Sequence, residues 1–283
     1  MRLPTRLLRR KVNSHKGDFG RVLILAGSAG LTGAAALCSK ACLLCGAGLV
    51  TLGIPESLNK VFIKIKEPEI MTLPLEETKE GSLSPRAFEK IKEFCRNIDV
   101  LAIGPGLSRN ASTLALAGKV IKSFPGAMVI DADGLNALNG HLELLAGRGV
   151  KVLTPHSGEM GGLLGTDVKE IEKNRKKVAK YFVNRYNIIL VLKGHRTLVA
   201  EKGKSLYVNK TGNPGMAKGG SGDVLTGMIA AFLAQGLSGF QAAKYAVYLH
   251  GLCGDLAARD KTQIAMTASD IIDNIPRAIK RSS

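Results

Sequence analysis

The sequence predicts an α/β fold of three layers, with a mostly parallel central sheet and helices on both of its faces. Two observations support this prediction. Short apolar runs typical of buried strands alternate with longer runs of helical periodicity along the 283 residues. Nearly every strand-like run also ends in glycine or a polar residue, where a parallel sheet meets its loops. Because no composition break or internal repeat divides the chain, we expect residues 1–283 to form one domain.

Apolar, β-prone runs bounded by glycine, proline or polar residues are the expected strands. Those of the main sheet are 22–26, 49–54, 61–65, 100–103, 127–130, 150–153 and 188–192. Two more runs, 197–200 and 205–208, flank a charged turn and predict a hairpin. In such a sheet, ligands bind beyond the carboxyl ends of the strands, so the strand-end residues are expected to share one edge.

Segments of helical periodicity lie between these strands and fill the last third of the chain. The first is rich in small residues, and Pro85 opens the second. The expected helices are 33–47, 85–96, 112–122, 135–145, 168–186, 222–235, 240–258 and 268–280.

The charge balance is strongly basic, with a formal net charge of +17 and a pI of about 9.8. The basic residues are dispersed, and along 169–180 they alternate in part with acids, which is typical of a solvated helix face. Aromatic residues make up only 5% and tryptophan is absent, which argues against stacking platforms for single-stranded nucleic acid. We therefore expect anionic small ligands and no nucleic-acid partner.

The five cysteines show no metal-ligand spacing. Cys38, Cys42 and Cys45 fall on one helix face, where they are expected to pack as small hydrophobic residues. The odd count and the absence of a secretory signal indicate reduced thiols in the cytoplasm. No apolar run reaches the roughly 18 residues that a membrane span needs, so no membrane partner is expected.

The segment 213–228 places four glycines and a carboxylate directly before an apolar helical run. The glycines are Gly215, Gly219, Gly220 and Gly222, and the carboxylate is Asp223. Glycines can turn several N–H groups toward one point, and the following helix adds the positive end of its dipole. The segment therefore predicts a phosphate-binding loop with a base beside it. The alternative is a glycine turn followed by an N-capping aspartate.

Other strand ends carry residues that could bind a ligand or only shape the fold. The run Gly104-Pro105-Gly106 allows close approach of a ligand or forms a tight turn, and it matches neither the dinucleotide fingerprint nor the Walker A pattern. Asp131 is favoured as a functional residue, which could polarise a hydroxyl or hold a cation through water. His156 could be functional or structural. Glu159 could hold a water on magnesium or cap a helix.

The run 193–197 leads out of the most apolar strand. Lys193 is a candidate phosphate partner, and Thr197 begins the hairpin that could cover a nucleotide. A charge-assisted hydrogen bond of this kind contributes about 1.5–3 kcal/mol. His250 is expected to pack in or near the core. Neither a convincing serine-hydrolase elbow nor a His-Glu-x-x-His zinc helix is found, so phosphate chemistry is the best-supported class.

The run Gly219-Gly220-Ser221-Gly222-Asp223 resembles the anion-hole motif of the ribokinase-like superfamily. Further segments resemble one branch of it, the ADP/ATP-dependent NAD(P)H-hydrate dehydratases: 15–20, 26–28, 103–106, 131–136, 154–159, 192–194, 213–215, 218–223 and 249–251. Ser221 departs from the threonine more often expected there. Some members carry a preceding epimerase domain, but only about 14 residues precede the first match, so we expect a dehydratase domain alone.

The resemblance implies a lyase that repairs hydrated NADH and NADPH, (6S)-NADHX and (6S)-NADPHX. ADP or ATP phosphorylates the ring hydroxyl, and phosphate then leaves. Asp223 is implied as the base, with Gly220, Ser221 and Gly222 as the anion hole and Mg²⁺ as the cofactor. The implied nucleotide contacts are Lys193, Gly194, His195, Arg196, Thr197 and Gly222. The implied contacts to the hydrated dinucleotide are Ala34, Gly104, Gly106, Asp131, His156 and Asp223.

Glu159 is the candidate metal ligand, and a homotetramer is implied by the same resemblance. The closest alternative is a vitamin-precursor kinase of the same fold, whose phosphate would stay on the product. A second alternative is a non-enzymatic protein that binds nucleotides or nucleic acid. The sequence leaves open whether ADP or ATP is the donor, and whether NADHX or NADPHX is preferred.

Overall fold

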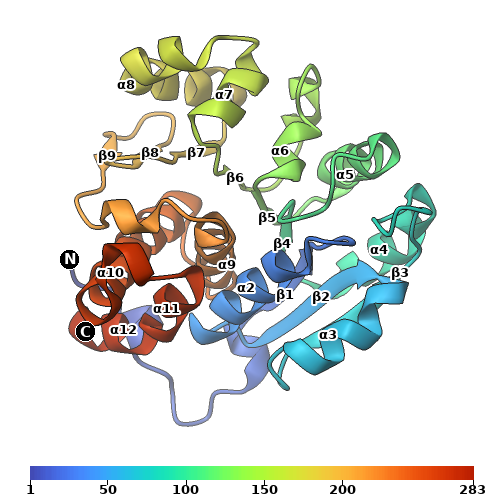
Figure 1. Ribbon diagram of the computed structural model, residues 1–283, viewed down its shortest axis with the longest axis horizontal. Helices are drawn as coiled ribbons and strands as arrows, with labels where there is room; N and C mark the ends of the chain where they lie inside the picture. The colour runs from blue at the N-terminus through green and yellow to red at the C-terminus, as the bar shows by residue number, and fades with distance from the viewer.

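The computed structural model describes residues 1–283 and contains one nine-stranded sheet (Figure 1). The strand order is β3-β2-β1-β4-β5-β6-β7-β8-β9, in which β1 to β7 pair in parallel, β8 pairs antiparallel with β7, and β9 pairs antiparallel with β8. Their bounds are Arg21–Leu25, Leu49–Pro55, Met71–Leu75, Val100–Ile103, Ala127–Ile130, Lys151–Leu153, Ile189–Leu192, Leu198–Ala200 and Tyr207–Val208, from β1 to β9. The predicted parallel sheet with a terminal hairpin is confirmed.

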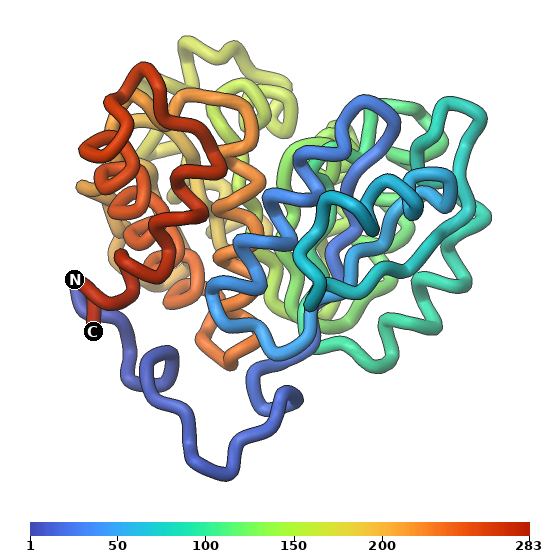
Figure 2. Tube along the Cα trace, turned by 60° about the horizontal axis from the view of Figure 1, so that its bottom comes forward, coloured from blue at the N-terminus to red at the C-terminus, as the bar shows by residue number.

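Helices cover both faces of the sheet (Figures 1 and 2). One face carries α1 (Thr5–Leu8), α2 (Thr32–Leu44), α3 (Asn59–Ile65), α9 (Ser221–Ala234), α10 (Gly239–Ala265), α11 (Ala268–Asp273) and α12 (Ile275–Arg281). The other carries α4 (Phe88–Phe94), α5 (Ala111–Ser123), α6 (Asp133–Asn136), α7 (Ser157–Leu164) and α8 (Val168–Tyr186). The predicted three-layer architecture is therefore confirmed.

The strands are apolar throughout because helices bury both of their faces. Along β1, Val22 and Ile24 pack into the core beneath α2 and α9, whereas Leu23 and Leu25 pack into the core on the opposite face. Successive strand residues point to opposite faces, so an uninterrupted apolar run is the expected pattern for such a strand.

The segment 61–65 was predicted as a strand, and this is wrong: it lies within helix α3. Only Phe62 of α3 is buried, while Val61, Ile63 and Ile65 remain exposed. A short apolar run has no periodicity that separates strand from helix. The strand that follows β2 in the sheet is instead β3, which was not predicted. Its Pro74 is tolerated because β3 is an edge strand.

The predicted helix 135–145 is also wrong in its extent. Helix α6 ends at Asn136, and a separate 3₁₀ turn covers Leu142–Leu145. Gly140 between them has a positive φ of 76°, which breaks the helix. The remaining predicted strands of the main sheet agree with the structure to within one residue at each end. Helix α7 was not predicted, and the predicted C-terminal helix is divided into α11 and α12.

The chain ends lie side by side (Figures 1 and 2), where the Leu3 N–H donates to the Ser282 carbonyl at 2.7 Å. None of the helices has the length and apolar character required to cross a membrane.

Candidate active site

The glycine loop before α9 presents a group of free backbone donors. Gly220 precedes the helix in the left-handed region, with φ of 90°, and Ser221 is the first helical residue. The N–H groups of Gly219, Gly220, Gly222 and Asp223 donate to no group in the protein. Helix N-termini leave such donors unpaired, and they bind anions well because the helix dipole adds a positive potential. The loop therefore has the donors of a phosphoryl-binding site.

Close packing requires glycine at position 220, and it brings Gly222 near the ends of two strands. A Cβ on Gly220 would lie 2.5 Å from Leu37 Cδ1, and the positive φ would strain any other residue. A Cβ on Gly222 would lie 3.3 Å from Lys193 Nζ and 3.7 Å from Asp131 Oδ2. The start of α9 thus approaches the ends of β5 and β7 closely, and it places the lysine ammonium beside the free amides.

The buried Asp131 and the half-buried Lys193 form an ion pair at the carboxyl ends of β5 and β7. Lys193 Nζ lies 2.7 Å from Asp131 Oδ1 and 3.6 Å from Glu159 Oε2. The Thr226 hydroxyl of α9 donates to Asp131 Oδ2 at 2.8 Å. Burial acts against the charged form of Lys193, but the Asp131 and Glu159 carboxylates outweigh it and raise the lysine pKa. Lys193 therefore stays protonated at neutral pH.

Asp223 lies in the first turn of α9, next to this pair. Burial of its carboxyl group raises its pKa from 3.8 to about 7. The negative charge of Asp131 adds to this rise, and the ammonium of Lys193 opposes it. A carboxyl group that titrates near neutral pH is well matched to accept a proton from a hydroxyl.

The run that follows β7 is shaped by backbone contacts. Gly194 has φ of 139°, and a Cβ there would lie 2.7 Å from an Arg175 nitrogen. Arg196 has an unusual positive φ of 54°. Thr197 Oγ1 donates to the Gly194 carbonyl at 3.0 Å, and the side chains of His195 and Arg196 are exposed. The run is thus an open loop that begins at the half-buried Lys193.

Gly104, Gly106 and Ala34 come together at the ends of β1 and β4. A Cβ on Gly104, where φ is 130°, would lie 1.7 Å from the Asp131 carbonyl oxygen, so only glycine fits. A Cβ on Gly106 would lie 3.0 Å from the Ala34 Cβ. Ala34 is half-buried in the first turn of α2. The sequence left open whether this glycine run forms a tight turn or lets a ligand approach, and the structure shows the tight turn, with glycine required by the protein's own close packing.

His156 and Glu159 form the N-terminal cap of α7. His156 Nδ1 accepts hydrogen bonds from the Gly158 and Glu159 N–H groups, and Glu159 accepts from the His156 N–H at 2.8 Å. The His156 side chain is 59% exposed, so its ring remains open to a ligand. Glu159 therefore does have the capping function that the sequence left open.

Two side chains around the site, Thr226 and Arg175, were not predicted, and the hydrogen bond of His250 was not predicted either. His250 Nε2 lies 3.3 Å from Ser221 Oγ. Arg175 belongs to the run 169–180, and the expectation that this run is a solvated face is wrong at that position. Its side chain is 14% exposed and donates to the carbonyls of Leu192 and Lys193. The only sequence signal for this exception was that basic and acidic residues alternate only in part along 169–180.

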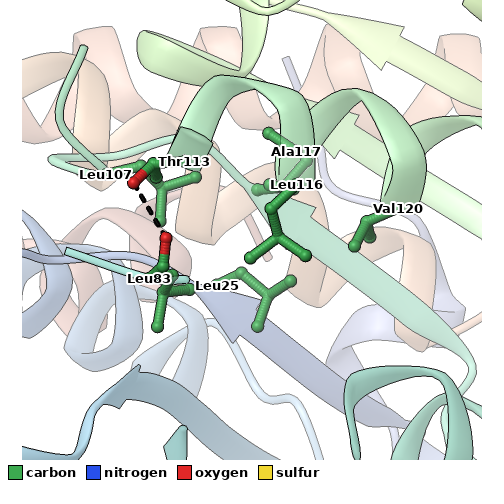
Figure 3. Close-up of a pocket in the computed structure, with 8 residues that line it drawn as sticks. Leu25, Leu83, Leu107, Thr113, Leu116, Ala117 and Val120 are labelled. Atoms are coloured by element: carbon green, nitrogen blue, oxygen red, sulfur yellow. Dashed lines mark hydrogen bonds between the residues drawn. The ribbon is translucent and has the colours of Figure 1, made fainter. Parts of the chain in front are cut away.

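The apolar gap under α5 is a separate feature (Figure 3). Seven of its eight lining residues are hydrophobic, and the Thr113 hydroxyl donates to the Leu83 carbonyl at 2.8 Å. It is too narrow for water and offers no charged group, so it does not suit a nucleotide.

Comparisons with known proteins agree on one family. A sequence model described as NAD(P)H-hydrate dehydratase matches residues 22–277. The chain is 46% identical over 277 residues to a bifunctional NAD(P)H-hydrate repair enzyme of Moorella thermoacetica, covering 98% of this chain and 52% of that protein. It therefore spans about half the length of this bifunctional relative. An ADP-dependent (S)-NAD(P)H-hydrate dehydratase of Neisseria meningitidis is 36% identical, covering 90% of this chain and 83% of that protein.

A solved structure supports the same relationship. The ADP/ATP-dependent NAD(P)H-hydrate dehydratase of Bacillus subtilis, co-crystallised with ATP and Mg²⁺, superposes with a TM-score of 0.84 at 30% identity. The alignment covers 100% of this chain and 95% of that one. A solved ribokinase-like protein shares the architecture as well, so the predicted ribokinase-like fold is confirmed.

Proposed function

Because this chain belongs to the NAD(P)H-hydrate dehydratase family, we propose that it dehydrates (6S)-NADHX and (6S)-NADPHX to NADH and NADPH. ADP or ATP would supply a phosphoryl group to the ring hydroxyl, with release of AMP or ADP. The observation that carries the proposal is a set of four unpaired amides at the start of α9, with one ammonium and one carboxyl group of near-neutral pKa beside them.

Asp223 is the proposed base. Its carboxylate takes the proton of the ring hydroxyl as the oxygen attacks the terminal phosphorus of the nucleotide, and the bond to the leaving nucleotide oxygen breaks. A carboxyl group with a pKa of about 7 is about half deprotonated at neutral pH, and its carboxylate is basic enough to take this proton. Asp223 also follows Gly222 directly, so base and anion hole lie in the same helical turn.

The anion hole is proposed to stabilise the phosphoryl group in transit. Charge is spread over its equatorial oxygens in the transition state, and the N–H groups of Gly219, Gly220, Gly222 and Asp223 are free to donate to them. Lys193 lies beside Gly222 and adds a positive charge. Because Asp131 and Thr226 hold Lys193 and its counter-charge in place, little reorganisation is needed during transfer.

The second step is an elimination. The carbon–oxygen bond to the new phosphate breaks as the lone pair of the ring nitrogen forms a double bond to that carbon. Loss of a proton from the neighbouring ring carbon then restores the dihydronicotinamide. Phosphate is a far better leaving group than hydroxide, and this is the chemical reason why the dehydration consumes a nucleotide.

Mg²⁺ is proposed as the cofactor, delivered with the nucleotide. No group of three metal-ligating side chains exists in the structure, and Lys193 already forms ion pairs with the carboxylates of Asp131 and Glu159. The residues therefore fit a magnesium ion held mainly by phosphate oxygens and waters, with Glu159 as the proposed outer contact. Bound in this way, the ion would neutralise phosphoryl charge.

The remaining contacts are proposed from the same resemblance. The loop 193–197 and Gly222 would bind the nucleotide, and the group Ala34, Gly104, Gly106, Asp131, His156 and Asp223 would bind the hydrated dinucleotide. Asp131 would act indirectly, because both of its oxygens are engaged by Lys193 and Thr226. We also propose that the chain is one dehydratase domain that assembles as a homotetramer in the cytoplasm, in keeping with its five free cysteines.

The test is to incubate the protein with (6S)-NADHX, Mg²⁺ and either ADP or ATP, and to follow the absorbance of the restored dihydronicotinamide. Release of inorganic phosphate in equal amount is expected. A vitamin-precursor kinase of this fold would instead retain the phosphate on its product. If NADH is restored neither with ADP nor with ATP, the proposal is refuted.

A further inference from the structure

The amide-bearing end of the glycine loop is held by only two side chains. Gly219, Gly220 and Gly222 have none, so the anchors are Lys218 before them and Ser221 within the first turn of α9. Lys218 Nζ donates to the carbonyls of Ile264 and Met266, the latter at 2.7 Å. The Ser221 hydroxyl has one partner, Nε2 of His250, at 3.3 Å. Glycine backbone has wide conformational freedom, so these two side-chain anchors help to restrict where the amides point.

Helix α10, which carries His250, is itself locked against the loop. Asp255 accepts from the Gly212 N–H at 3.0 Å and from Asn213 Nδ2 at 3.1 Å. A Cβ on Gly251 would lie 2.3 Å from Thr211 Oγ1, so glycine lets the loop pack directly on the helix. The position of the His250 ring relative to Ser221 is therefore set by α10 as a whole.

His250 is suited to an uncharged hydrogen bond. Its side chain is half-buried, and this burial lowers its pKa to about 4, with the nearby Lys193 ammonium acting in the same direction. The imidazole is thus neutral at neutral pH. A neutral ring adds no positive charge to the anion hole, where Lys193 already supplies one.

We propose that His250 is a positioning residue, which holds the Ser221 hydroxyl and thereby aligns the free amides of Gly219, Gly220, Gly222 and Asp223 on the transferred phosphoryl group. This inference rests on the proposed function. It also gives a role to the segment 249–251, which the reaction as described above does not use.

The test is a double-mutant cycle on the dehydratase reaction with His250→Leu, Ser221→Ala and the pair together. One net hydrogen bond separates the variants, so His250→Leu is expected to lower kcat about five- to tenfold. In the Ser221→Ala background the same change should cost less than about twofold. His250→Gln, whose amide can still bond the hydroxyl, should recover most of kcat. The matched control, His141→Leu on the surface, should leave kcat unchanged.

Fully additive losses in the cycle, or no recovery in His250→Gln with a correctly folded protein, would overturn the proposal. A second measurement does not depend on turnover: the ring nitrogen resonances of His250 should shift in Ser221→Ala, while those of His141 should not. Unchanged His250 resonances would also overturn it. If the wild-type protein fails to restore NADH, the proposed function falls, and the Ser221–His250 contact is still decided by the resonances.

Discussion

Replacement of Asp223 by asparagine separates catalysis from binding most sharply. Asparagine keeps the size and the polar character of the side chain but cannot take the hydroxyl proton. Loss of a general base lowers kcat by about 10²- to 10⁴-fold. The free amides and Lys193 remain, so affinity for ADP should change little. In the wild-type protein, kcat/KM should rise with pH through about 7, because the base must be deprotonated to act.

The same substitution should stabilise the fold. The pKa of Asp223 is raised from 3.8 in the unfolded chain to about 7 in the folded one, so the folded state binds more protons between these values. Folding stability therefore falls as pH rises through this window. About three units at 1.36 kcal/mol each give an upper limit of about 4 kcal/mol above the window. Asp223→Asn removes this cost, so its stability advantage over wild type should grow between about pH 4 and about pH 7, be complete above this window and vanish below it.

The assay combines single-turnover NADH recovery, ADP titration by calorimetry, and chemical denaturation of both proteins at about pH 4 and about pH 8. Turnover within threefold of wild type in Asp223→Asn would refute the assignment of the base. A variant that is less stable than wild type at the higher pH would refute the reasoning on burial, even if activity were lost.

Three further substitutions test the support of the site. Thr226→Val leaves Oδ2 of the buried Asp131 without a donor, and should lower the free energy of unfolding by about 1–3 kcal/mol in denaturant titrations. An unchanged denaturation midpoint would contradict this. Gly220→Ala should abolish NADH recovery because its Cβ has no room, whereas Gly33→Ala, with no atom within 4 Å, should fold normally. Lys193→Met should cost about 3–5 kcal/mol of stability, because it leaves the buried carboxylate of Asp131 without its counter-charge. The exposed control Lys204→Met should cost less than about 1 kcal/mol, and equal losses in the two would argue against the buried pair.

Several features of the site were readable from local sequence. The glycines at 219, 220 and 222 directly before an apolar helical run predicted free amides at a helix start, and the structure has them. The wholly apolar run 188–192 predicted a buried strand, because strands of a parallel sheet are covered on both faces, and β7 confirms it. Local pattern was insufficient at 61–65, where a run of five residues fits either a strand or a helix.

The sequence by itself determined the order of strands and helices, the glycine loop at the start of α9 and the position of one carboxyl group beside it, since each depends on residues that are neighbours in the chain. Only the tertiary structure decided how that carboxyl group titrates and what surrounds it. Asp131 meets Lys193 across 62 positions and Thr226 across 95, and Ser221 meets His250 across 29. Burial and charge act through space, so the pKa of Asp223 follows from the packing of α9 against the ends of β5 and β7, which no local pattern contains.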